Sequence, residues 1–180
     1  MRNQIKRFFF FFYILSINDP YYTEHRWDTC YEDVITELKK LPDVTAVLEM
    51  GPYKAPFVEN SDVMDQLDFS EYFPFKINKV IQHDCTKLPY PIKDKEYDLV
   101  IASQVLEHLG YFGEQVDIFK EISRISKKAI IGLPYKWHMP FDRTHHMIDE
   151  EVFDAWQGEF NHIYEKKNKT AIIRIFDFGD

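Results

Sequence analysis

A chain of 180 residues, 45% of them apolar and 17% aromatic, is long enough for one compact domain with a substantial core, and a second domain is not expected. Twenty-two basic residues against 30 acidic ones give a formal charge of −8, and no cluster of lysine and arginine follows the opening segment. This charge pattern predicts no nucleic-acid partner and favours a small-molecule partner.

The opening segment begins with basic residues and continues with an apolar run, Phe8 to Ile17, which includes five consecutive phenylalanines. Because about 20 apolar residues are needed to cross a bilayer, no transmembrane span is expected. No small-residue cleavage site follows, although a signal or a misassigned start codon stays an alternative. We expect residues 1–20 to be a packed or partly disordered extension, with a protein or membrane-surface contact through Phe8 to Phe12 as the alternative, and residues 21–180 to form one domain.

The two cysteines, Cys30 and Cys85, form neither a closely spaced metal-binding pair nor a disulfide framework. We interpret both as free thiols, which indicates a reducing compartment and predicts a cytoplasmic location.

The first half of the domain alternates between helical and strand-like patterns. Apolar residues at helical spacing predict a helix over 31–41. Short apolar runs that end in turn residues then predict strands over 45–50, 62–64, 79–83 and 97–102.

The second half begins with a predicted helix over 114–126, which leads into a strand over 129–134. A loop with aromatic residues and histidines follows, and then a short helix over 149–157 in which Asp149 is the expected cap. Two further runs, 162–166 and 170–178, are typical of an antiparallel hairpin.

Nearly all-apolar strands separated by helices indicate a parallel sheet covered on both faces. The predicted fold class is therefore α/β: a Rossmann-like three-layer α/β/α sandwich of about seven strands, mostly parallel, with a C-terminal antiparallel hairpin.

Polar residues close the first three predicted strands. Glu49 and Gly51 stand at the C-terminal end of the first, Asp65 or failing it Asp68 follows the second, and Asp84 follows the third. In open α/β sheets, ligands bind outside the carboxyl ends of the strands, where a carboxylate can accept hydrogen bonds from ribose hydroxyls or an adenine amino group. The alternative is structural, because Asp is also common in turns and caps.

The stretch from Leu88 to Leu109 carries the most specific motif. The order LPYP, Asp94, YDLVIAS and VLEHL resembles class I S-adenosylmethionine-dependent methyltransferases, and in particular the methyltransferase type 11-like domain. The resemblance extends over Val47 to Pro134, and Glu121 to Ile125 is similar to the family's E-x-x-R-V motif before its fifth strand.

This resemblance implies that S-adenosyl-L-methionine is the cofactor and S-adenosyl-L-homocysteine the product. It also implies that Glu49 and Gly51 contact the methionine part, that Asp65 binds the ribose hydroxyls, and that Asp84 with the Cys85 backbone holds the adenine.

Ser103 and Gln104 would, by the same resemblance, line the methionine and sulfonium side of the cofactor. His108 matches the family's LEHL motif, and its alternative is a structural histidine whose ring is satisfied by a nearby carboxylate or carbonyl. The sequence departs from the family in its loop after Glu49, where Gly51 stands in place of two or three glycines and Pro52 and Pro56 add stiffness.

The loop after the predicted strand over 129–134 contains His138, His145 and His146, which are candidate catalytic bases because imidazole titrates near neutral pH. Asp142 is a candidate to orient one of them. A divalent metal held by these histidines with Asp142 and Asp149 is an alternative, but no helical His-x-x-x-His spacing supports it, and we predict no metal. A third interpretation is a solvated loop anchored by its aromatic residues.

The sequence as a whole predicts S-adenosylmethionine-dependent methylation, with transfer to oxygen on a small or sugar-like acceptor. The alternative is a catalytically inactive scaffold or binding subunit with the same fold. A sugar-nucleotide or NAD enzyme is a weaker alternative, since no second glycine would admit a pyrophosphate.

Overall fold

A computed structural model describes residues 30–41, 44–109, 113–137 and 147–179. The Phe-rich run and the three candidate bases, His138, His145 and His146, lie outside these residues, as does Asp142. The predicted boundary between residues 1–20 and the domain also lies outside them.

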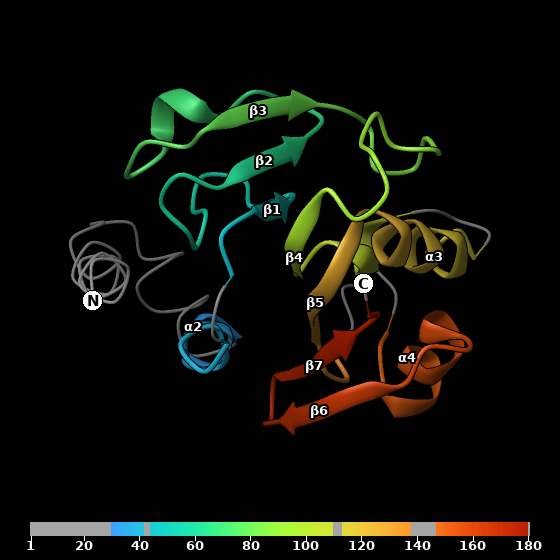
Figure 1. The fold of residues 1–180 in the computed structure, drawn as a ribbon. Helices are drawn as coiled ribbons and strands as arrows, with labels where there is room; N and C mark the ends of the chain where they lie inside the picture. Colours follow the sequence, from blue (N-terminus) through green and yellow to red (C-terminus); the bar gives the residue numbers. More distant parts are fainter. Residues whose placement is uncertain (1–29, 42–43, 110–112, 138–146, 180) are drawn as a thin grey trace.

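The centre of the domain is a seven-stranded sheet with the order β3-β2-β1-β4-β5-β7-β6 (Figure 1). Five strands are parallel: β1 (Val47–Met50), β2 (Asp62–Asp65), β3 (Lys79–Gln82), β4 (Tyr97–Ser103) and β5 (Ser126–Pro134). The last two, β6 (His162–Lys167) and β7 (Ala171–Asp177), form an antiparallel hairpin, and β7 pairs with β5. The predicted fold class is confirmed.

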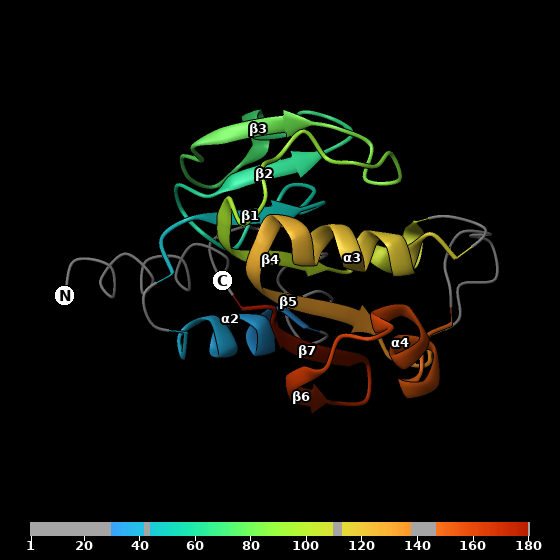
Figure 2. The ribbon, with the colours of Figure 1, turned by 45° about the vertical axis from the view of Figure 1, so that its right-hand side comes forward.

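Three α-helices in the described part of the chain flank the sheet. The helix α2 (Glu32–Leu38) lies on one face, and α3 (Gln115–Ile125) and α4 (Glu150–Gln157) lie on the other (Figures 1 and 2). Each has the amphipathic pattern that the sequence predicts, although α2 ends three residues before the predicted limit. The carboxylate of Asp149 accepts a hydrogen bond from the Val152 amide at 3.0 Å, so the predicted cap of α4 is confirmed.

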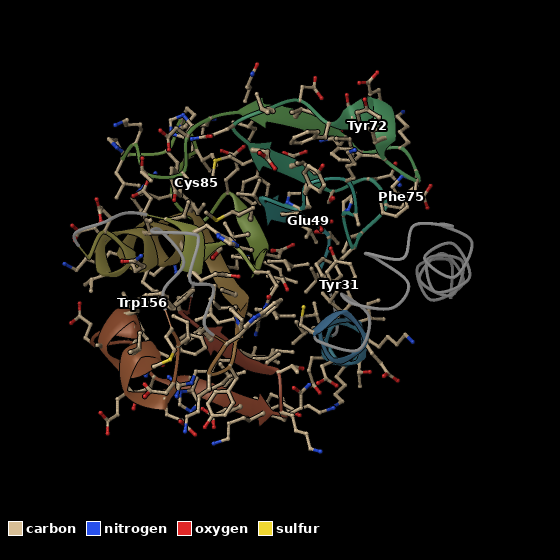
Figure 3. All side chains as sticks on the ribbon, turned by 180° about the vertical axis from the view of Figure 1, so that it is seen from behind. Tyr31, Glu49, Tyr72, Phe75, Cys85 and Trp156 are labelled. Carbon is tan, nitrogen blue, oxygen red and sulfur yellow. The ribbon has the colours of Figure 1, made fainter. Side chains whose placement is uncertain are left out.

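Alternate residues of β1, β4, β5 and β7 supply two separate apolar cores. The core under α3 and α4 is the larger one, and in it the ring of Phe119 lies edge-on to Phe153 and Phe176. The core under α2 contains Val34, Leu38 and Leu99 and receives part of its cover from loops. Side chains of both cores fill the space between the layers (Figure 3).

The connections between the first strands are short. Residues 51–61 join β1 to β2 by bends and turns, and residues 66–78 join β2 to β3 with one turn of 3-10 helix, η2 (Ser70–Tyr72). A second such turn, η3 (Leu106–His108), follows β4. Among the described residues, α2 is therefore the one α-helix on its face of the sheet. No helix in the described part of the chain combines the length and apolar character that a membrane crossing requires.

Candidate functional site

A pocket of about 460 Å³ lies where β1, β2 and β3 end. Because parallel strands share one direction, the residues that follow them meet at the same edge of the sheet. Gly51, Asp65, Asp84, Cys85 and His108, which the sequence singled out separately, all line this pocket. Glu49, Ser103 and Gln104 are not among the residues that line it.

Gly51 forms the floor of the pocket at the end of β1. Its backbone has a φ of +56°, and its amide donates to the carbonyl of Met64 at 2.8 Å. A Cβ atom at this position would lie 2.9 Å from Cγ2 of Val105. Both the positive φ and the close approach of Val105 therefore require glycine here.

Asp65 ends β2 at the pocket wall, whereas Asp68 is exposed and binds its own turn through the Ser70 amide. Partial burial raises the pKa of Asp65, and backbone amides, including that of Leu67 at 3.4 Å, oppose this shift. The sequence left both residues open as the acid after the second strand, and the structure places Asp65 at the pocket.

Asp84 and Cys85 lie on the neighbouring side of the pocket, after β3. The amide and the hydroxyl of Thr86 donate to Asp84 at 2.9 and 2.7 Å, and these bonds lower the pKa of the Asp84 carboxyl. Burial raises the pKa of the Cys85 thiol to about 12, so this thiol stays protonated at neutral pH and is a poor nucleophile.

His108 stands at the mouth of the pocket on η3. Its side chain is 41% exposed, and its Nε2 lies 3.7 Å from Oε1 of the buried Glu107. The Glu107 carboxylate is therefore the kind of neighbour expected if His108 is a structural histidine. The ring of His108 also lines the pocket.

Glu49 is fully buried and its carboxylate contacts the loop that follows β1 (Figure 3). The amides of Phe57 and Val58 donate to it at 2.5 and 2.8 Å, and the hydroxyl of Ser61 donates at 2.9 Å. Burial raises the pKa of Glu49 to about 7, and these three hydrogen bonds limit the rise. Glu49 thus holds the loop in place, and its contact with a cofactor stays a prediction.

Ser103 and Gln104 end β4. The hydroxyl of Ser103 lies 3.4 Å from the Cys30 thiol, next to the beginning of α2. Gln104 has a φ of +58°, and its amide donates to the carbonyl of Gly132 at 2.8 Å. Its side-chain Nε2 is buried without a hydrogen-bond partner within the described part of the chain. A buried amide of this kind is costly unless something else accepts its hydrogen bond.

The motif from Glu121 to Ile125, which is similar to the family's E-x-x-R-V, connects α3 to the segment around Tyr90. Glu121 accepts the Tyr90 amide at 2.6 Å and pairs with Arg124 at 2.6 Å. Arg124 also donates to the carbonyl of Ile92 at 2.9 Å. The motif on α3 therefore holds residues 88–91 (LPYP) in place, and these residues follow Cys85 at the pocket wall.

Sequence reasoning missed five residues that line the pocket: Gln66, Thr86, Val105, Leu109 and Glu114. Thr86 had a local signal, because a threonine two residues after an aspartate is typical of a turn closed by that side chain. Val105 had none, since its proximity to Gly51 depends on the pairing of β1 with β4. Within the residues that the structure describes, no cluster of three metal-binding side chains occurs.

A family model for a methyltransferase domain matches residues 52–129, which contain β2, β3, β4 and every residue that lines the pocket except Gly51. By this match, residues 52–129 form a methyltransferase domain. The prediction of the enzyme class and of its cofactor is confirmed. No relative among the curated proteins matches the chain by sequence.

Solved structures share the fold of this methyltransferase at low sequence identity. The PH0226 protein from Pyrococcus horikoshii OT3 has a TM-score of 0.67 and 17% identity, over 89% of this chain and 92% of its own. The N-methyltransferase NodS from Bradyrhizobium japonicum WM9, in complex with S-adenosyl-L-homocysteine, has a TM-score of 0.60 and 13% identity over 96% and 97%. The N-terminal domain of EvdMO1, crystallised in the presence of S-adenosylhomocysteine and D-fucose, has a TM-score of 0.52 and 12% identity over 82% of each chain.

Proposed function

We propose that the pocket between Gly51, Asp65 and Asp84 binds S-adenosylmethionine and that the enzyme methylates an oxygen of a small, sugar-like acceptor. The observation that carries the cofactor part is the meeting of these residues in one pocket at the carboxyl edge of the sheet. When bound, the cofactor supplies an electrophilic methyl group on a sulfonium.

The residues present fit this cofactor. Asp65 accepts hydrogen bonds from the ribose hydroxyls, and Asp84 accepts from the adenine amino group, because a carboxylate retains acceptor sites beyond those that Thr86 occupies. Gly51 lines the same pocket and presents only backbone there, where the methionine part would bind. The buried Nε2 of Gln104 would donate to a ligand at the end of β4, and Ser103 stands beside it.

The acceptor part of the proposal concerns an oxygen of a small, sugar-like molecule. EvdMO1 was crystallised with D-fucose, whereas NodS is an N-methyltransferase, so the shared fold allows either class of acceptor. An acceptor hydroxyl must lose its proton as its oxygen binds the methyl group. We propose that one of His138, His145 and His146 takes this proton and that Asp142 orients the histidine.

Calorimetric titration with S-adenosylmethionine and S-adenosylhomocysteine tests the cofactor site. Asp65→Ala and Asp84→Ala should each weaken binding by roughly 10- to 100-fold, the usual effect of removing a charged hydrogen-bond partner. Asp68→Ala is the matched control, since this nearby acid binds its own turn, and its affinity should equal that of the wild type. Wild-type affinity in both pocket variants would refute the assignment.

A turnover screen with sugars and small hydroxyl compounds tests the acceptor. Once an acceptor is known, replacement of the base by alanine should lower kcat by roughly 10²- to 10⁴-fold while cofactor affinity stays unchanged. If His138→Ala, His145→Ala and His146→Ala all retain full turnover, the loop supplies no base. Cofactor binding without turnover on any acceptor would favour the scaffold alternative.

A further inference from the structure

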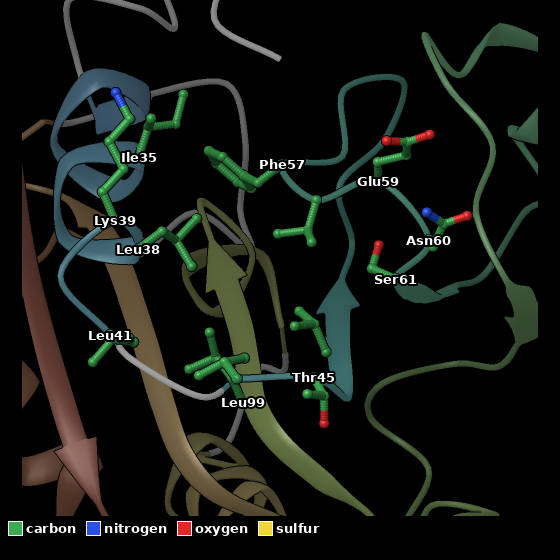
Figure 4. A pocket seen from close by; sticks show the side chains of 13 residues that line it. Ile35, Leu38, Lys39, Leu41, Thr45, Phe57, Glu59, Asn60, Ser61 and Leu99 are labelled. Atoms are coloured by element: carbon green, nitrogen blue, oxygen red, sulfur yellow. The ribbon is translucent and has the colours of Figure 1, made fainter. Parts of the chain in front are cut away.

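A second cavity, of about 240 Å³, lies under α2. It sits on the face of the sheet opposite α3 and α4, near the beginning of β1 and β4, and so away from the cofactor pocket at their other ends (Figure 4). Its walls are mostly apolar and include Ile35, Leu38, Val47, Phe57, Val58 and Leu99.

The cavity results from the short connection between β1 and β2. Residues 51–61 form bends and turns that cross this face at one side, and α2 has seven residues, so the two elements do not meet over Val47 and Leu99. Five of the lining side chains, those of Ile35, Leu38, Val47, Phe57 and Leu99, are buried. An apolar space among such side chains favours an apolar occupant over water.

We propose that the Phe-rich segment, residues 8–17 of the same chain, binds in this cavity. The five phenylalanines Phe8 to Phe12 have the apolar, aromatic chemistry that the lining accepts.

The chain length permits this contact within one molecule. The residues between Phe12 and Cys30 span up to roughly 55 Å when extended, whereas α2 is about 10 Å long. A tether of this length gives an effective concentration near the millimolar range, so binding within the same chain should exceed binding between two copies at micromolar protein.

Disulfide formation in the full-length chain tests the proposal directly. Phe10→Cys is combined with Lys39→Cys, because Lys39 is exposed at the end of α2 and lines the cavity. The matched control combines Phe10→Cys with Lys120→Cys, which is exposed on α3 across the sheet. Both native cysteines are buried, and Phe10→Cys alone measures any reaction with them.

The Phe10–Lys39 pair should form a disulfide within the monomer about 10-fold or more faster than the Phe10–Lys120 pair, because docking raises the local thiol concentration. Equal rates for the two pairs would overturn the proposal. Disulfides that form between two molecules alone would also overturn it, and would identify a second copy of the chain as the occupant.

Binding of an apolar fluorescent dye supplies an independent readout with a predicted sign. Replacement of Phe8 to Phe12 by serine should increase dye fluorescence, because it empties the cavity. A decrease would mean that the phenylalanines themselves bind the dye in the wild type and are therefore exposed, which contradicts docking. Circular dichroism of both chains checks that the substitutions leave the fold of the domain unchanged.

Discussion

The two faces of the sheet are built differently. On one face, α3 and α4 cover a continuous core in which Phe119, Phe153 and Phe176 pack edge to face. On the other face, the seven-residue α2 and the loop over 51–61 leave a cavity above Val47 and Leu99. The strands contribute twelve buried apolar residues to the first core and seven to the second. The connections add to this difference, because they carry α-helices after β4 and β5 but not after β1 and β2.

The unequal helical cover of the two faces does not alter the set of residues at the strand ends. The proposed cofactor pocket lies at the edge of the sheet, where Gly51, Asp65 and Asp84 stand at the ends of three strands held in register by parallel pairing. It depends on the strand ends more than on the helices that cover them. A face with little helical cover can thus coexist with a complete set of strand-end residues.

The largest loss of unfolding free energy is expected for a large-to-small substitution in the core under α3 and α4, compared with one in the core under α2. Phe119→Ala should lower the free energy of unfolding by about 3–5 kcal/mol, because it empties a fully packed site. Leu38→Ala on the other face should cost about 2 kcal/mol, at the low end for this substitution, since Leu38 already borders open space. Equilibrium urea unfolding measures both, and equal losses would contradict the difference in packing.

A pH-dependent effect is expected from Glu49, on the α2 face. Its pKa is about 7 in the folded chain against a usual 4.5, so the folded state binds the proton more tightly. The stabilisation is complete below pH 4.5 and is lost as the pH rises to about 7, a fall of about 3 kcal/mol at roughly 1.4 kcal/mol per pH unit.

Glu49→Gln isolates this effect because glutamine does not titrate. The difference in unfolding free energy between wild type and Glu49→Gln should change between pH 4.5 and 7 and stay constant above that range. Unfolding curves in urea at a series of pH values measure it. Parallel pH profiles for the two proteins would show that burial does not perturb this carboxyl.

A smaller loss of unfolding free energy is expected at Gly51, which follows β1 and lines the pocket. Gly51→Ala should cost about 1–3 kcal/mol, because its φ of +56° strains alanine and the new Cβ approaches Val105. Gly113→Ala is the matched control, since its φ of +90° is also positive but nothing lies within 4 Å. Val105→Ala in the Gly51→Ala background should recover the part that is due to contact. No recovery would assign the whole cost to the backbone.

The smallest effect is expected at the beginning of α4. Asp149→Ala should lower the unfolding free energy by about 1 kcal/mol, because the Val152 amide loses its acceptor. Glu151→Ala, at an exposed position of the first turn, should change it by less than half as much. Thermal unfolding compares the two, and an equal shift in Tm would indicate a general charge effect in place of a cap.

Sequence patterns alone determined the order and type of the elements, because period-2 and period-3.6 apolar spacing reflects which residues must leave water. They also supported the methyltransferase fold through LPYP, YDLVIAS and VLEHL, since these residues form one continuous stretch of the chain. The sequence also predicted that Gly51 and Asp84 lie at the ends of strands, because each follows a short apolar run.

Tertiary structure decided what depends on contacts between distant segments. It placed Asp65 and not Asp68 at the pocket, turned the Glu49 carboxylate toward the amides of residues 57 and 58, and brought Val105 against Gly51. It also left a cavity under α2 that no local pattern predicts, because a cavity is a property of how elements fail to meet in space. Local sequence fixes backbone preferences, whereas these contacts arise from strand register and packing across the whole sheet.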